Sequence, residues 1–298
     1  MKIVVAGGSG FLGEPLVRRL MARGDDVAVL SRDPLKVKAG RGVRWDGITP
    51  GSWTAEIDAA DVVVNLAGEN VGAGRWTESR KRRLINSRVE ATNAIVAALM
   101  SAPRKKRTLI NASAVGYYGT DRDTPVEESS SKGRGFLADL VEQWESAAKR
   151  AEAVARVVIL RFGVVLAADG GALAKMVVPF RFGAGGPVGS GQQWMSWVDR
   201  DDVLDAIQWA IDHDHVRGVY NITAPEPVRN REFAKTLGRV LHRPAVMPAP
   251  AFALRLIFGE MADEALLGGQ RAVPRRAMRE GFVFQSPTIE AALRRIRR

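Results

Sequence analysis

Short apolar runs and amphipathic stretches alternate along the first half of the chain. Five runs rich in valine, isoleucine and leucine have the pattern of buried parallel strands: residues 3–6, 27–30, 62–66, 108–112 and 156–161. Three longer stretches carry apolar side chains at helical spacing: residues 14–23, 77–100 and 135–154. Gly24 and Pro103 suit the ends of the first two helices. This alternation predicts an α/β fold with a doubly wound parallel sheet.

The second half of the chain is less regular. Residues 183–191 are rich in glycine and predict a loop, residues 200–212 a helix and residues 218–222 a short strand. Three prolines, at positions 244, 248 and 250, precede an apolar helix that ends at Phe258. We therefore expect two units. They are a nucleotide-binding domain over residues 1–244, with substrate-side insertions after about residue 165, and a small C-terminal domain over residues 245–298.

A glycine-rich turn joins the first predicted strand to the first predicted helix. Its sequence, GGSGFLG at residues 7–13, has the spacing GxxGxxG. Glycines let the backbone approach a pyrophosphate closely, and a helix N-terminus presents free N–H groups to it. We expect a dinucleotide here rather than a tight turn without a ligand. The predicted contacts are Gly7, Ser9, Gly10, Phe11, Leu12 and Gly13.

The end of the second strand predicts which nicotinamide dinucleotide binds. An acidic residue there binds a ribose hydroxyl, whereas an arginine accommodates a 2′-phosphate. About 20 residues past the glycine turn the chain has Ser31 and Arg32, and we expect Asp33 to point elsewhere. The permanently charged guanidinium of Arg32 suits a phosphate. The sequence therefore predicts NADP(H) rather than NAD(H).

The third apolar strand, residues 62–66, ends in small residues. Ligands of open parallel sheets bind at the carboxyl ends of the strands, so this segment should lie along the cofactor. The residues expected there are Leu66, Ala67, Gly68 and Glu69. Asp61, which precedes the strand, has two open interpretations, an adenine contact or a cap facing a helix.

Composition limits the class of protein. The chain has 298 residues, 46% of them hydrophobic, which is enough for a sizeable core. It contains no cysteine, so disulfide and thiolate chemistry are excluded. The first apolar run is too short for a signal sequence, and no run reaches the roughly 20 residues of a membrane span. We expect a soluble, cytoplasmic protein that does not bind membranes.

The net charge of +11 comes partly from three basic clusters: residues 80–83, residues 104–107, and Arg294, Arg295, Arg297 and Arg298. A surface for polyanions is one interpretation, and solvated helix faces with a charged tail are the other. No nucleic-acid motif or aromatic platform accompanies the clusters, so nucleic acid is not the expected partner. A positive field would also help to recruit a phosphorylated cofactor.

Several motifs resemble those of extended and atypical short-chain dehydrogenases/reductases, the NAD(P)-dependent epimerase/dehydratase superfamily. They are GGSGFLG (7–13), DVVVNLAG (61–68), NASAVGYYG (111–119), LRFGVVL (160–166) and WVDRDDV (197–203). GGPVGSGQQWMSWV (185–198) and GGQRAVPRRAMREGFVF (268–284) are similar to an epimerase-like subgroup with a C-terminal domain of unknown function. The resemblance implies a Rossmann-type sheet, an NADP-type cofactor and a substrate pocket built by the C-terminal half.

The resemblance also implies a Ser–Tyr–Lys centre, with tyrosine and lysine four residues apart on one helix face. There the lysine lowers the tyrosine pKa, so that the phenol can exchange a proton with substrate. The chain has three tyrosines, Tyr117, Tyr118 and Tyr220, and none has a lysine four residues later. The expected neighbourhood holds instead Leu140, Val141, Trp144 and Glu145. The usual proton donor and its electrostatic helper are missing.

Other polar residues are candidates for the chemistry. Ser113 matches the region of the superfamily's catalytic serine, where it would bond a substrate oxygen; a serine that satisfies strand backbone is the alternative. Tyr117 or Tyr118 would supply a phenol at the pocket rim. Glu142 and Glu145 are candidate acids, although helix carboxylates are usually solvated.

The remaining candidates have a structural alternative each. Trp194, Met195 and Trp197 would line a pocket or pack in the core. Arg161 would bind an anionic substrate group or anchor the sheet edge. The DHDHV segment, residues 212–216, fits a solvated helix end better than a metal site.

The first functional hypothesis is an NADP(H)-dependent oxidoreductase or epimerase-like enzyme. Its substrate would be a small carbonyl or hydroxyl compound, with a sugar nucleotide among the candidates. The second is a non-catalytic NADPH-binding regulatory protein, which the missing tyrosine–lysine pair favours. A nucleic-acid-associated protein is the third and weakest. Related folds imply a homodimer through two long helices, here residues 77–100 and 135–153.

Overall fold

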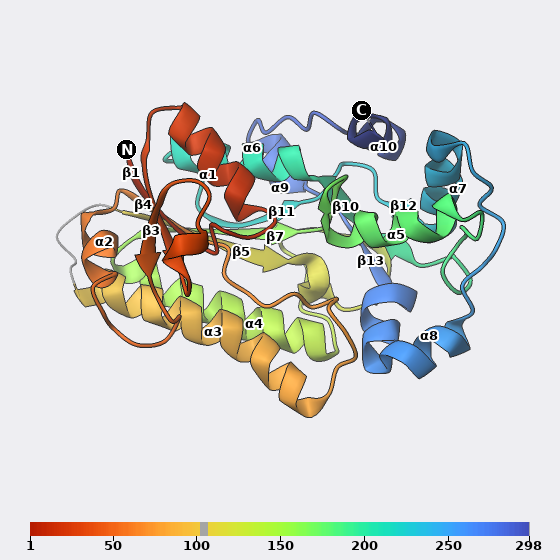
Figure 1. The fold of residues 1–298 in the computed structure, drawn as a ribbon, viewed down its shortest axis with the longest axis horizontal. Helices are drawn as coiled ribbons and strands as arrows, with labels where there is room; N and C mark the ends of the chain where they lie inside the picture. The colour runs from red at the N-terminus through yellow and green to blue at the C-terminus, as the bar shows by residue number, and fades with distance from the viewer. Residues whose placement is uncertain (102–106, 298) are drawn as a thin grey trace.

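A parallel β-sheet lies at the centre of the molecule, between two layers of helices (Figure 1). The computed structural model describes residues 1–101 and 107–297. Within them seven strands pair in parallel, in the order β11–β7–β5–β4–β1–β2–β3. The strands are β1 (Lys2–Ala6), β2 (Asp26–Ser31), β3 (Arg41–Arg44), β4 (Val62–Asn65), β5 (Thr108–Ala114), β7 (Arg156–Phe162) and β11 (Gly218–Ile222).

Both faces of the sheet are buried, because alternate residues of each strand enter different cores. Ile3 and Val5 join one core with side chains of α1 and α6, while Val4 and Ala6 join the other with side chains of α2 and α3. Figure 1 shows α1 and α6 above the sheet and α2, α3 and α4 below it. These helices are α1 (Gly13–Ala22), α2 (Thr54–Ala59), α3 (Glu78–Ser101), α4 (Phe136–Lys149) and α6 (Arg200–Asp212).

The strand order reverses beside β1. The strands that follow β1 first extend the sheet on one side, through β2 and β3, and then on the other, through β4, β5, β7 and β11. Open sheets of this kind bind ligands at the carboxyl ends of the strands next to such a reversal. The carboxyl ends of β1 and β4 carry the glycine turn and the segment that begins at Leu66.

The second half of the chain adds short paired strands and helices beyond the sheet (Figure 1). The strand pairs are β6 (Asp121–Val126) with β13 (Gly269–Ala272), β8 (Val164–Ala167) with β10 (Trp197–Asp199), and β9 (Trp194–Met195) with β12 (Val228–Arg229). The helices are α5 (Gly171–Arg181), α7 (Asn230–Leu241), α8 (Ala251–Phe258), α9 (Arg275–Arg279) and α10 (Ile289–Arg297), and a π-helical turn covers Ala262–Leu267. Buried side chains of α7 and α10 share one core, so the end of the chain packs against an earlier element.

The predicted fold class is confirmed, and α6 and β11 have the predicted bounds. The helix expected over residues 135–154 ends as α4 at Lys149, and a 3₁₀ turn, Arg150–Ala153, follows it. Pro103 and most of the second basic cluster lie outside the described residues. In the part of the chain that the structure describes, no helix is long and apolar enough to cross a membrane.

Candidate functional site

The glycine turn is so tightly packed that two of its positions require glycine. Gly7 has φ +76°, and a Cβ there would lie 2.8 Å from the Leu66 carbonyl oxygen. A Cβ on Gly13 would lie 2.2 Å from the Gly7 carbonyl oxygen. Gly10 closes the turn by donating its N–H to that same oxygen at 3.0 Å. The turn therefore places the N-terminus of α1 at the carboxyl ends of the strands. A phosphate can bind there to the free N–H groups of the helix.

The rest of the turn faces outward. Ser9 and Gly10 are exposed, and Phe11 and Leu12 are half-buried. Phe11 packs beside the Gly170–Gly171 pair, where added Cβ atoms would contact its ring at 2.8 and 3.0 Å. The Arg200 guanidinium lies 5.3 Å from the ring centre of Phe11. All six predicted turn residues lie between the carboxyl end of β1 and the start of α1, and their contacts with a cofactor stay a prediction.

The turn after β2 leaves one cation available. Ser31 Oγ donates to the Asp33 carbonyl oxygen at 3.0 Å and accepts the Asp33 N–H at 3.1 Å. The Asp33 carboxylate pairs with Lys36 at 2.9 Å, and its direction relative to a cofactor stays a prediction. Arg32 is exposed, and its guanidinium forms no hydrogen bond or ion pair with the described residues. This is the geometry required of a residue that binds a phosphate from outside the protein.

A buried amide network fixes the end of β4. The Asn65 amide nitrogen donates to Thr92 Oγ1 at 2.9 Å and to Asn111 Oδ1 at 2.7 Å, while its oxygen accepts the Ala67 N–H at 3.2 Å. The backbone of Leu66 and Ala67 is consequently held against Gly7. Asp61, in contrast, lies at the amino end of β4 and accepts the Lys2 N–H at 2.8 Å. The interpretation of Asp61 as an adenine contact is wrong. Asp61 lies at the amino ends of the strands, whereas the glycine turn lies at their carboxyl ends.

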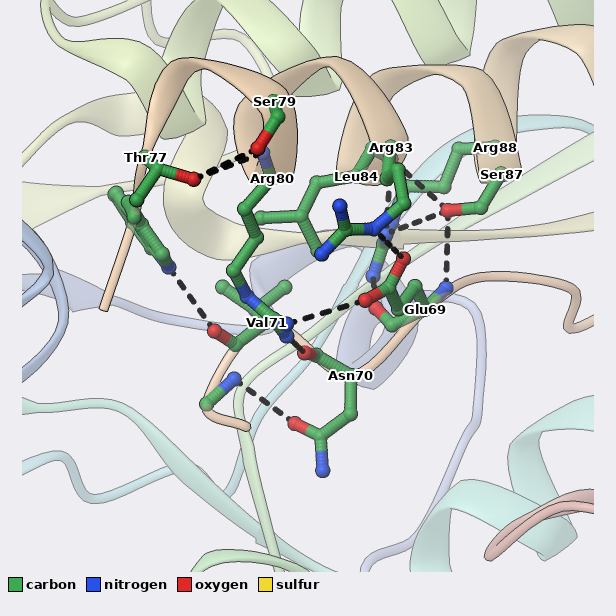
Figure 2. A network of polar contacts seen from close by, with 12 residues as sticks. Glu69, Asn70, Val71, Thr77, Ser79, Arg80, Arg83, Leu84, Ser87 and Arg88 are labelled. Carbon is green, nitrogen blue, oxygen red and sulfur yellow. Dashed lines mark hydrogen bonds and ion pairs between the residues drawn. The ribbon is translucent and has the colours of Figure 1, made fainter. Parts of the chain in front are cut away.

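Helix α3 holds every polar group of Glu69 (Figure 2). The Glu69 carboxylate lies between Arg80 and Arg83, at 3.2 and 3.5 Å. Its N–H donates to Ser87 Oγ at 3.0 Å, and its carbonyl oxygen accepts from Arg88 at 2.9 Å. A direct cofactor contact by Glu69 stays a prediction, but its side chain is turned toward α3.

Arg88 is a half-buried cation that contacts the segment after β4. Burial lowers the pKa of Arg88 to about 10, against the opposing influence of Glu69, so the guanidinium stays charged at neutral pH. It donates to the carbonyl oxygens of Leu84 and Glu69 and lies 5.3 Å from the Trp144 ring. A Cβ on Gly68 would lie 3.0 Å from its Cζ. Arg88 thus fixes the backbone at Gly68 and Glu69.

Most of the described residues in the basic clusters form ion pairs within the chain. Arg80 and Arg83 bind Glu69, and Lys81 binds Glu260. In the second cluster Arg107 is buried and donates to Asp58. In the third, Arg294 binds Glu290 and Arg295 binds Asp201. Arg83, Arg294 and Arg295 remain exposed, which is compatible with solvated faces, and these pairs leave fewer of the described cations for a nucleic acid.

Three polar residues near the end of β5, Ser113, Glu145 and Arg161, form a buried ionic network with one another. Ser113 Oγ donates to Glu145 Oε1 at 2.6 Å. The Arg161 guanidinium binds both oxygens of Glu145, at 2.7 and 2.8 Å. Arg161 is 2% exposed and Glu145 is 1% exposed, so an anionic substrate cannot reach this arginine. Glu142, the other candidate acid, is on the outer face of α4 and pairs with Lys132.

Two tyrosines stack against this network. Tyr118 OH accepts a hydrogen bond from Arg161 at 2.8 Å and donates one to Asn221 Oδ1 at 2.8 Å. Burial raises the pKa of Tyr118 to about 12, although Arg161 favours ionisation. Tyr117 lies with its ring 3.6 Å from Arg161 Cζ. The geometry argues against Tyr118 as a proton donor, and catalytic roles for Tyr117 and Ser113 stay predictions.

A cavity of about 270 Å³ lies at the carboxyl ends of β5 and β7, the same end of the parallel sheet at which the glycine turn follows β1. Leu137 and Val141, four residues apart on α4, line it together with Ala114, Gly116 and Phe162. Apolar side chains four residues apart thus form the cavity face of α4, the helix on which the resemblance implied a tyrosine and a lysine. Polar side chains come mainly from later segments: Thr120, Gln193, Ser196, Asn230, Glu264 and Gln270.

The aromatic candidates divide between the cavity and the core. Trp194 and Met195 line the cavity, whereas Trp197 is fully buried in the packing of the second half. His213 follows the last turn of α6 and is exposed, as expected. Within residues 1–101 and 107–297, no group of three or more potential ligands could hold a metal ion.

Glu264 and Leu137 are cavity residues that sequence reasoning missed. Glu264 Oε1 and Oε2 accept the N–H groups of Phe136 and Leu137, in the first turn of α4, at 2.7 and 2.9 Å. A signal for this contact was present, because the residue before α4 is Gly135, which has no side chain to cap the helix. The acceptor therefore had to come from elsewhere in the chain.

Comparison with known proteins agrees with this geometry. Residues 3–223 match the model of the NAD dependent epimerase/dehydratase family, and residues 249–296 match a domain of unknown function, DUF1731. The chain is 41% identical to the epimerase family protein ML0860 of Mycobacterium leprae, over 98% of this chain and 94% of that protein. It is 39% identical to the epimerase family protein YfhF of Bacillus subtilis, over 98% of this chain and 97% of that protein.

A solved structure with the same fold is the human epimerase family protein SDR39U1, crystallised with NADPH. It superposes with a TM-score of 0.90, at 36% identity, over 99% of each chain. The family model covers most of the chain, and both relatives match nearly end to end. The chain therefore belongs to the NAD-dependent epimerase/dehydratase family.

Proposed function

We propose that the protein binds NADP(H) across the glycine turn and catalyses hydride transfer between it and a small carbonyl or hydroxyl compound. The observation that carries this proposal is the cavity at the carboxyl ends of β5 and β7, because the glycine turn lies at the same end of the parallel sheet. The crystallised relative with NADPH, SDR39U1, supports the choice of cofactor.

The residues of the turn fit a dinucleotide. Added Cβ atoms on Gly7 and Gly13 would clash with backbone, so the chain there keeps the close approach that a pyrophosphate needs. The N–H groups at the start of α1 would bind the phosphates. Arg32, exposed and unpaired among the described residues, would bind the 2′-phosphate.

The cavity lies where a substrate would meet the nicotinamide. It is bounded by residues after β5 and β7, which follow β4 in the sheet, and by Val71, which comes just after the cofactor segment. NADP(H), when bound, would supply or accept the hydride. The apolar side chains of Leu137, Val141 and Phe162 would exclude water and orient the substrate.

A non-catalytic NADPH-binding regulator is the second candidate. The observation that favours it is the pair Leu137 and Val141, which offers no proton donor on the α4 face of the cavity. A regulator needs the cofactor site but no turnover. The two candidates therefore share the first half of the proposal and differ in the second.

The experiment that separates them follows NADPH oxidation at 340 nm with a panel of small aldehydes and ketones. The oxidoreductase predicts turnover that Leu137→Trp, which fills the cavity, abolishes without weakening NADPH binding. Leu256→Trp, on the exposed side of α8, is the matched control. NADPH binding without turnover on any compound would favour the regulator. Absence of NADPH binding would refute both.

A further inference from the structure

The cavity has one charged side chain in its wall. Among the described residues that line it, Glu264 is acidic, and no lysine, arginine or histidine is present. The other polar groups are neutral amides and hydroxyls. An anionic substrate would therefore meet a carboxylate and no cation among these lining residues.

Glu264 is held in a defined position. The chain brings it from the π-helical turn Ala262–Leu267 to the first turn of α4, where its oxygens accept two backbone N–H groups. Gly135 permits this approach, because a Cβ there would lie 2.7 Å from Glu264 Oε1. No lysine or arginine within the described ranges forms an ion pair with it, so its charge is balanced only by the helix N-terminus.

This arrangement determines which ligand groups can bind nearby. The N–H groups of Phe136 and Leu137, which would otherwise attract an anion, are already used by Glu264. Each carboxylate oxygen has two acceptor positions, and one backbone bond uses only one of them. Glu264 can therefore still accept a hydrogen bond from a hydroxyl or an ammonium group.

Neutral polar groups in the wall can also bind a ligand. They suit a ligand group that both donates and accepts hydrogen bonds. Asn230 is 8% exposed, and its Oδ1 accepts the Val188 N–H at 2.7 Å. Its amide nitrogen has no hydrogen-bond partner among the described residues, and Asn230 is one of the residues that line the cavity. A hydroxyl group matches such a wall, because it donates and accepts.

The size of the cavity restricts the ligand as well. About 270 Å³ is slightly below the range of roughly 300–1,000 Å³ typical of sites for drug-sized ligands. A nucleoside-diphosphate sugar is larger and carries two phosphates, which proteins bind with arginine, lysine or free N–H groups. The wall supplies none of these cations.

We infer that the cavity takes a small, largely apolar, neutral or cationic molecule that donates a hydroxyl or amino hydrogen to Glu264, and that it excludes sugar nucleotides. This inference rests on the proposed function, because it assumes that the cavity is the substrate site. It assigns Glu264 the role of a specificity residue supplied by the C-terminal segment.

Three probes of equal size and different charge test the inference: benzylamine, benzyl alcohol and benzoate, with UDP-glucose as a fourth. Binding to NADPH-loaded protein at pH 7 is measured by ligand-observed NMR and calorimetry. We expect benzylamine and benzyl alcohol to bind, and benzoate and UDP-glucose to bind about tenfold more weakly or worse. Leu137→Trp should block every probe that binds, which places them in this cavity. Binding of benzoate or UDP-glucose as tight as that of benzylamine would overturn the inference.

Variants then test Glu264 itself. Glu264→Gln should weaken benzylamine about tenfold and remove most of its advantage over benzoate. The matched control is Asp263→Asn, which alters the neighbouring exposed carboxylate that pairs with Arg255. An unchanged advantage in Glu264→Gln would contradict the assignment. If that variant does not fold, the order of the probes in the unaltered protein still decides.

Failure of the proposed function has a separate signature. NADPH loading is followed by the rise in its fluorescence, and the probes are measured with and without NADPH. Absence of loading or turnover counts against the proposed function alone, whereas a preference for benzoate or UDP-glucose in either state counts against the inference.

Discussion

Replacing Glu145 by glutamine should cost the protein much of its stability. In the native structure both carboxylate oxygens of Glu145 bind the Arg161 guanidinium, at 2.7 and 2.8 Å, and one also accepts from Ser113. In Glu145→Gln an amide NH₂ would face a guanidinium N–H, and the buried arginine would lose its counter-charge. Although burial alone would lower the pKa of Arg161, its bonds to Glu145 raise that pKa above the usual range, so it stays charged.

The expected magnitude follows from this burial. Removing one partner of a buried ion pair typically destabilises a protein by about 3–5 kcal/mol. Glu142→Gln is the control on the same helix, because Glu142 pairs with Lys132 at the surface. Exposed pairs contribute about 0–1 kcal/mol, so this variant should unfold almost like the unaltered protein.

Urea unfolding followed by far-ultraviolet circular dichroism measures both variants, and equal slopes make the comparison valid. In the double variant Glu145→Gln/Arg161→Met, an apolar side chain replaces the stranded charge, so stability should partly return. The reasoning is refuted if Glu145→Gln lies within about 1 kcal/mol of Glu142→Gln. It is also refuted if the double variant is no more stable than Glu145→Gln.

Three other predictions follow. Tyr118 should ionise only near pH 12, because burial raises its pKa, so Tyr118→Phe should leave the absorbance titration at 295 nm unchanged below pH 11. Gly13→Ala should abolish NADPH binding and destabilise the protein by about 1–3 kcal/mol, because the added Cβ would lie 2.2 Å from a carbonyl oxygen. Gly51→Ala is the control, since its Cβ would have its nearest neighbour at 3.4 Å. Burial raises the pKa of Asp202 to about 6, so the folded state favours the neutral carboxyl; its contribution to stability, about 3 kcal/mol, is present at pH 4 and lost by pH 7. Urea unfolding at both pH values should therefore show a weaker pH dependence for Asp202→Asn.

Local patterns carried enough information to predict the sheet and the glycine turn. The strands β1, β4, β5 and β7 are buried on both faces, so their apolar runs are unambiguous. Strand β3, in contrast, lies at the edge of the sheet, is partly exposed and reads RGVR, which has no recognisable pattern. It was missed for that reason.

The polar networks depend on contacts between distant residues, which spacing cannot predict. Ser113 and Glu145 are 32 residues apart, and Tyr118 and Asn221 are 103 residues apart. Ser113, Glu145 and Tyr118 were candidates for the chemistry, but only the fold shows that each one is bonded to a distant buried partner. The sequence showed that the tyrosine–lysine pair is absent, but it did not show the buried ionic network around Arg161.

The most direct test of the account compares NADPH and NADH binding by calorimetry, in the unaltered protein and in Arg32→Ala. We expect the unaltered protein to bind NADPH more tightly than NADH. In Arg32→Ala the affinity for NADPH should fall about tenfold to hundredfold, and the affinity for NADH should not change. Arg255→Ala, which removes an equal charge from α8, should affect neither. Equal or tighter binding of NADH by the unaltered protein, or an Arg32→Ala variant that still distinguishes the two cofactors, would contradict it.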